Sequence, residues 1–194
     1  YLDKPWDGDE TAYPVGDVGY HYSIGKYEIS EEMIEKANSE GSLAITIDDR
    51  GSKKPATSIS WLEAARFVNW LNTSQGSPPA YNFEHQPEED AYSIEDPASN
   101  WPEGGEEWQV DNPLRNRHAF YFIPTENEWL KAAYHVKLYE TIGLYWDYPT
   151  QQTNPSYPIH VTGGTGTYEA VYDIYDGHTN GRQPQPADID YAEG

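Results

Sequence analysis

The residues best suited to chemistry in this chain are its acids, because the usual nucleophiles and soft metal ligands are missing or scattered. None of the 194 residues is a cysteine, so the chain supplies no thiolate. The six histidines never fall at i and i+4, and none belongs to a His-Glu-x-x-His frame. The 33 Asp and Glu residues offer hard oxygen ligands, which favour calcium over softer metals.

Aromatic residues in loop-like stretches form a second set of candidates. Exposed rings in loops can stack on sugars or peptides, which predicts a ligand-binding groove. The alternative is that the same rings fill the core of a fold with few regular elements. The candidate ligand-binding residues are Trp101, Trp108, Tyr145, Trp146 and Tyr148.

Two capping boxes predict where helices begin. Ser60 is followed three residues later by Glu63, and Thr125 by Glu128, so that each side chain can bond the other residue's backbone N–H. We therefore expect helices over residues 60–72 and 125–135. Ser30 is a good N-cap for a third helix, over residues 30–37.

The apolar stripes of the two helices with capping boxes predict the core. Residues at helical spacing on each stripe should face inward. The residues expected to be buried together are Trp61, Phe67, Leu71, Trp129 and Ala133.

The rest of the chain indicates short strands and long loops. Residues 20–29 alternate loosely, and residues 43–47 and 119–123 are also β-like. Residues 73–118 are polar and rich in proline. The resulting fold class is α+β, with a few helices packed on a small antiparallel sheet and much irregular loop.

Composition excludes several partners. The net charge is −21 and the pI is about 4.4, which disfavours nucleic acid and anionic membrane surfaces. No run of 18 apolar residues is present, so we expect no membrane span. Aromatic residues make up 14% of the chain, enough to build a core despite the low hydrophobic content.

Three segments, in order, resemble the formylglycine-generating enzyme (sulfatase-modifying factor) family. Residues 122–134 are similar to its Leu-Pro-Thr-Glu-x-Glu-Trp-Glu-x-Ala-Ala signature, residues 59–71 to its Val-Ser-Trp helix, and residues 22–30 to its opening strand. The resemblance implies a single C-type-lectin-like domain over residues 1–194, incomplete at its C-terminus.

The resemblance also bears on metals. The family's enzymes act through two cysteines that bind copper, and a related iron-dependent branch uses histidines from a separate helical domain. Neither set occurs in these residues, so we expect no copper or iron site within this chain. Residues 186–190 resemble a calcium-binding segment of the family, which implies that the Asp188 side chain and the Ile189 carbonyl bind calcium.

Three interpretations follow. We favour a non-catalytic binding or structural module of a bacterial protein, extracellular or at the cell surface, whose partner is a protein or glycan ligand or another copy of the chain. The first alternative is an oxidoreductase of the formylglycine-generating type whose catalytic cysteines lie outside this chain. The second is a lectin-like receptor that binds its ligand on an aromatic patch.

Overall fold

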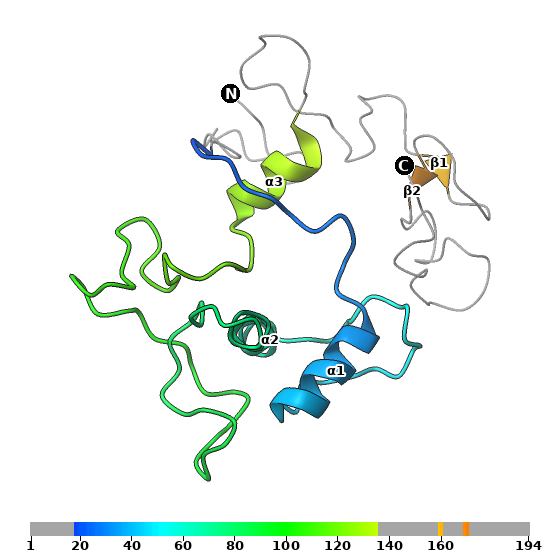
Figure 1. The fold of residues 1–194 in the computed structure, drawn as a ribbon. Helices are drawn as coiled ribbons and strands as arrows, with labels where there is room; N and C mark the ends of the chain where they lie inside the picture. The colour runs from blue at the N-terminus through cyan, green and yellow to red at the C-terminus, as the bar shows by residue number, and fades with distance from the viewer. Residues whose placement is uncertain (1–17, 136–158, 161–168, 171–194) are drawn as a thin grey trace. The chain divides into compact units, whose positions relative to one another are not determined.

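The computed structural model describes residues 18–135, together with the backbone of residues 159–160 and 169–170. The chain divides into two compact units, of which one comprises Glu28–Ile123 and the other comprises Tyr1–Tyr27 with Pro124–Gly194. Helices α1 and α2 belong to the first unit, and helix α3 belongs to the second (Figure 1). Each unit is described below by itself.

Helix α1 spans Glu31–Gly41 and begins, as predicted, after Ser30. The Ser30 side chain accepts a hydrogen bond from the backbone N–H of Met33. The helix is longer than the predicted 30–37, because the polar residues that suggested a break continue it to Gly41. It ends where Ser42 takes a left-handed conformation (φ 54°) and donates its N–H to the Asn38 carbonyl.

Helix α2 spans Trp61–Thr73 and helix α3 spans Glu126–Tyr134. Both capping boxes are complete, which confirms the predicted helix starts. In α2 the Glu63 N–H donates to Ser60 Oγ at 3.2 Å, and the Ser60 N–H donates to Glu63 Oε2 at 2.7 Å. Thr125 and Glu128 repeat the same pair of bonds in α3.

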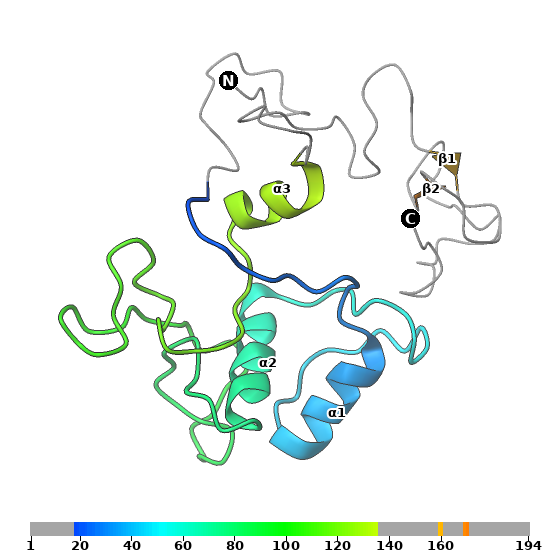
Figure 2. The ribbon, with the colours of Figure 1, turned by 45° about the horizontal axis from the view of Figure 1, so that its top comes forward.

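The main core of the first unit lies between α1, α2 and the irregular chain that follows α2. Helices α1 and α2 lie beside each other in Figures 1 and 2. Phe67 is buried, as predicted, and Leu71 is half-buried against the same cluster. The buried apolar residues of this core are Ile34, Ala37, Leu43, Ile45, Ala65, Phe67, Val68, Ala80, Tyr81, Phe83 and Ala119.

The prediction that Trp61 and Trp129 are buried in the core is wrong. Trp61 is 45% exposed, because it is the first residue of α2 and packs edge-on against Tyr81, with ring centroids 5.2 Å apart. Trp129 is 44% exposed. Helix α3 buries Leu130 and Tyr134 instead, and these form a separate small cluster in which Ala133 is only half-buried.

Regular strands are scarce in the described residues. Strands β1 (Ile159–His160) and β2 (Glu169–Ala170) pair in parallel, and isolated antiparallel bridges join Ser30 to Pro55 and Asn82 to Ser99. The predicted β-like runs at 20–29, 43–47 and 119–123 are not strands. Residues 43–47 cannot form a regular strand because Ala44 has a φ of 60°, which interrupts the extended backbone. The antiparallel sheet stays a prediction.

None of the helices among the described residues is both long enough and apolar enough to cross a membrane.

Candidate ligand-binding site

A cavity of about 520 Å³ opens between the end of α1, one face of α2 and the segment 79–88. This volume lies in the usual range for small-molecule sites. Residues 66, 69, 70 and 73 of α2 share one helix face, so a single rigid element supplies a whole wall. The lining residues are Glu40, Gly41, Ser42, Leu43, Arg66, Asn69, Trp70, Thr73, Pro79, Gln86, Pro87 and Glu88.

Two local features shape the end of α1 and the chain that follows it. Asn38 bonds both backbone groups of Ile45: its Nδ2 donates to the carbonyl and its Oδ1 accepts from the N–H, each at 2.8 Å. Gly41 then packs directly on the indole, since a Cβ at this position would lie 2.5 Å from Trp70 Cδ1. A side chain there would push α1 away from α2, so the glycine is needed for this wall of the cavity.

Two asparagines of α2 bond the irregular chain that packs against this helix. Asn69 exchanges two hydrogen bonds of 2.8 Å with the backbone of Tyr81. Asn72, which is fully buried, accepts the N–H groups of Phe120 and Tyr121 at 2.9 Å and donates to the Tyr121 carbonyl at 3.0 Å. These amides satisfy loop backbone groups that have no ladder partner.

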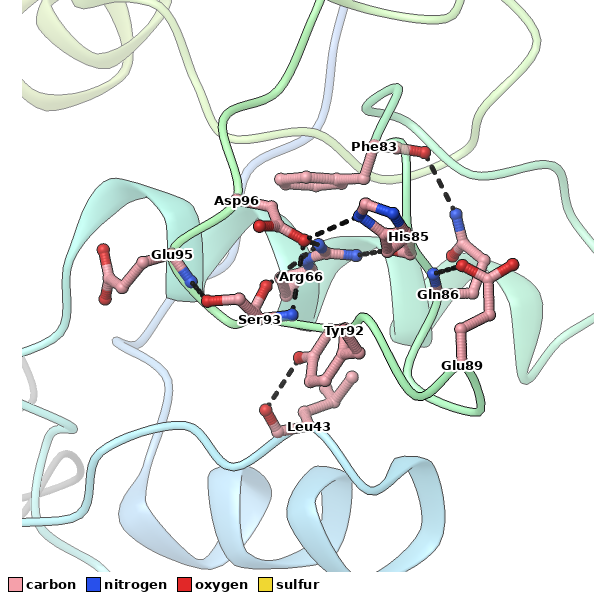
Figure 3. Close-up of polar contacts among 10 residues, drawn as sticks. All are labelled: Leu43, Arg66, Phe83, His85, Gln86, Glu89, Tyr92, Ser93, Glu95 and Asp96. Carbon is pink, nitrogen blue, oxygen red and sulfur yellow. Dashed lines mark hydrogen bonds and ion pairs between the residues drawn. The ribbon is translucent and has the colours of Figure 1, made fainter.

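Arg66 organises the loop behind the cavity, as Figure 3 shows. Its side chain is 1% exposed, and its guanidinium lies between two rings, 3.7 Å from the centroid of Phe83 and 4.8 Å from that of Tyr92. Its Nη1 donates to the His85 carbonyl at 2.7 Å, and its Nη2 donates to the Ser93 carbonyl at 3.2 Å. A planar, five-donor cation is well suited to such combined stacking and bonding.

The charge of Arg66 is balanced close by. Asp96 Oδ2 lies 3.7 Å from Arg66 Nη2 and 3.3 Å from His85 Nδ1. Burial lowers the pKa of Arg66, although nearby Tyr92 and Asp96 oppose the shift. Burial likewise raises the pKa of Tyr92, whose hydroxyl donates to the Leu43 carbonyl at 2.8 Å. The network thus connects the loop of residues 83–96 to the chain that follows α1 (Figure 3).

Two buried carboxylates of the same unit serve folding. Glu31 accepts the backbone N–H groups of Arg50 and Gly51, at 2.8 to 3.1 Å. Glu63 accepts those of Thr46 and Ser60, each at 2.7 Å. Burial alone would raise the pKa of Glu63, but these hydrogen bonds outweigh it and lower the pKa below its usual value. Glu63 is therefore held as a carboxylate by backbone donors.

Metal-binding clusters are not found in the part of the chain that the structure describes, where no three His, Cys, Asp or Glu residues lie together suitably. The predicted calcium ligands Asp188 and Ile189 lie outside the described residues, so that site stays a prediction. The same holds for Tyr145, Trp146 and Tyr148.

The two described candidates for an aromatic groove do not line the cavity. Trp101 is half-buried, and its indole Nε1 donates to the Ala80 carbonyl at 3.2 Å, which ties the 101 loop to the core. Trp108 is also half-buried. Whether either ring binds a ligand stays a prediction.

Sequence reasoning missed the residues that do line the cavity. Trp70 lies on the apolar side of a helix and is half-buried, so its sequence position predicts only core packing. The informative signals were polar: Arg66 and Asn69 fall on the buried face of α2, and Gly41 closes α1. Buried polar residues on a helix face indicate an irregular chain segment whose backbone groups they bond.

Comparison with known proteins gives one finding. A family model described as "Sulfatase-modifying factor enzyme 1-like domain" matches residues 11–184, nearly the whole chain. No curated protein and no solved structure matches the chain.

Proposed function

The chain belongs to the sulfatase-modifying factor enzyme 1-like family, and we propose that within this family it is a non-catalytic binding module. The family's fold is C-type-lectin-like. Within that fold we propose an α+β arrangement in which the helices pack on a small antiparallel sheet.

The observation that carries the proposal is the absence of cysteine from the matched residues 11–184. Copper-dependent oxygen activation in the resembled enzymes needs a pair of thiolates, which this chain cannot supply. Within residues 18–135, the histidines His21, His85, His118 and His135 belong to no metal-binding group. The residues of this chain therefore do not fit a copper oxidase site.

The cavity beside Trp70 supports a binding role. Its walls are two helices and a loop held by buried hydrogen bonds, and sites on rigid elements keep their geometry without a ligand. An indole and several polar side chains line it, but no strong nucleophile does. We propose a protein or glycan as the partner and an extracellular location in a bacterium, in keeping with the acidic surface.

Copper affinity tests the proposal. The folded chain should leave Cu(I) bound to a chromogenic chelator, whereas a cysteine-containing enzyme of the family should remove it in the same titration. Circular dichroism before and after the titration checks that the chain is folded. Tight, stoichiometric transfer of Cu(I) to the chain would contradict the proposal, because it would show a copper site built without thiolates.

A further inference from the structure

We propose that the cavity beside Trp70 binds a primary alkylammonium group, such as the side chain of a lysine or one end of a polyamine. This inference names a ligand class for the proposed binding function and rests on it. Four features of the cavity carry it: unpaired carboxylates, the ends of two helices, an aromatic wall and the absence of a metal cluster.

Two carboxylates stand on different walls of the cavity. Glu40 comes from the last turn of α1 and Glu88 from the following loop, and both side chains are exposed. Neither makes a hydrogen bond or an ion pair within residues 18–135. The one cation in the lining is Arg66, which is 1% exposed and already bonded to two carbonyls beside Asp96. The accessible charge of the cavity is therefore negative.

Helix ends add to this negative potential. Glu40 and Gly41 belong to the last turn of α1, and Thr73 is the last residue of α2, so both helices end at the cavity. The C-terminus of a helix carries partial negative charge, which basic residues in the last turn often offset. Neither α1 nor α2 has a basic residue in its last turn. Several of the terminal carbonyls accept hydrogen bonds from neighbouring groups, so the helix ends contribute a negative field at the cavity and not a set of open acceptors.

The loop that borders the cavity is strongly acidic. Residues 84–96 include no lysine or arginine. Field lines from several acids around a concave site raise the local concentration of cations. The acids of this loop are Glu84, Glu88, Glu89, Asp90, Glu95 and Asp96.

An organic cation fits this cavity better than a metal ion. Calcium needs several oxygen ligands around one point, and no suitable group of three acidic or histidine side chains occurs in the described residues. Part of the Trp70 indole lines the cavity beside the atoms that Gly41 covers, and aromatic rings are favourable neighbours for alkylammonium ions. Leu43, Pro79 and Pro87 supply apolar surface for an alkyl stem. The cavity thus combines a site for the charge with a site for the chain that carries it.

The position of the two acids favours an ammonium head over a guanidinium. A guanidinium is a planar fork that pairs best with one carboxylate, through two parallel hydrogen bonds. An ammonium has three rotatable donors around one nitrogen and can reach acceptors on separate walls. Glu40 and Glu88 belong to different segments of the chain, and a head group with freely oriented donors can pair with either carboxylate.

NMR titration of the chain tests the proposal. The probes are Nα-acetyl-lysine methylamide, which presents a protein-like lysine, and cadaverine, which represents a free polyamine. Nα,Nε-diacetyl-lysine methylamide keeps the stem and removes the charge. The Trp70 indole N–H signal, assigned with Trp70→Phe, reports the cavity.

Two double variants with the same net charge separate a specific site from general attraction. Glu40→Gln/Glu88→Gln removes the cavity acids, and Glu32→Gln/Glu103→Gln removes exposed acids that neither line the cavity nor belong to the loop of residues 84–96. We expect the first to weaken binding about tenfold and the second less than about twofold. The diacetylated probe should not shift the Trp70 signal.

The outcomes divide clearly. A preference for the lysine probe would identify a protein ligand, and a preference for cadaverine a polyamine; either supports the proposal. Equal weakening in both double variants would overturn it, because only diffuse charge would then attract the probes. No shift at Trp70 with either probe would also overturn it, while leaving the copper test of the non-catalytic function unaffected.

Discussion

Helices α2 and α3 begin with the same capping motif but bury different sets of residues. Each starts with a complete Ser/Thr-x-x-Glu capping box, and each carries a tryptophan and an alanine at helical spacing. Both helices leave this tryptophan about half exposed, yet α2 buries Arg66, Asn69 and Asn72 along with its apolar residues, whereas α3 buries only Glu128, Leu130 and Tyr134. A capping box therefore fixes where a helix starts, but the loops that it must hold decide which face is buried.

The comparison is tested most strongly at Arg66. Arg66→Met should lower the free energy of unfolding by about 3–5 kcal/mol, because it removes the donors to two loop carbonyls and leaves Asp96 without its arginine partner. Urea denaturation measures the change. Arg66→Lys keeps the charge but loses the stacked fork, so it should recover only part of the loss. A cost below about 1 kcal/mol for Arg66→Met would show that the loop is held by other contacts.

In α3 the same comparison predicts unequal effects for two neighbours. Leu130→Ala should cost about 2–4 kcal/mol, because Leu130 is 2% exposed and centres the small cluster with Tyr134. Trp129→Ala should cost only about 1 kcal/mol, since the ring is 44% exposed and its main contact is an edge-to-face pair with Tyr134. Thermal or urea denaturation of both variants decides the order, and a larger loss at Trp129 would return that ring to the core.

Acid should destabilise α2 through Glu63. Its pKa is lower in the folded chain than the usual 4.5, so its stabilising contribution is present above that pH and is lost as the pH falls through the folded-state pKa. The free energy of unfolding should therefore decrease with pH below about 4.5. Glu63→Gln should flatten part of this decrease, whereas Glu32→Gln, at an exposed position, should not. Parallel slopes for wild type and Glu63→Gln would remove Glu63 from the explanation.

The smallest expected effect concerns calcium. We expect the melting temperature to be higher in millimolar calcium than in matched magnesium or chelator, because an ion that binds only the folded state stabilises it. Asp188→Ala should abolish the difference if the proposed ligand pair is correct. Equal melting temperatures in all three solutions would contradict the prediction that the folded chain binds a stabilising calcium ion.

Local sequence patterns were sufficient for the helices and insufficient for their surroundings. Ser30, Ser60 and Thr125 marked the starts of the three helices found in residues 18–135, because capping depends on residues within one turn. The buried face of α2 could not be read in the same way. Asn72 accepts from residues almost 50 positions away in the chain, and no local periodicity contains that information.

The cavity was beyond prediction for the same reason. It depends on Gly41, Trp70 and Glu88, which come from three separate segments and meet only in the fold. Sequence reasoning instead selected exposed-looking aromatics such as Trp101, whose indole bonds the core. The strand predicted at residues 43–47 also failed, because Ala44 takes a left-handed conformation that an alanine in the sequence does not indicate.

The most direct measurement of the central claim is turnover. The folded chain is incubated with a cysteine-containing sulfatase peptide, copper, reductant and oxygen, and the peptide is analysed by mass spectrometry beside a reaction with a catalytic enzyme of the family. We expect the peptide cysteine to stay unmodified with this chain and to be converted to formylglycine by the control enzyme. Catalytic conversion by this chain, which contains no cysteine, would contradict the non-catalytic function.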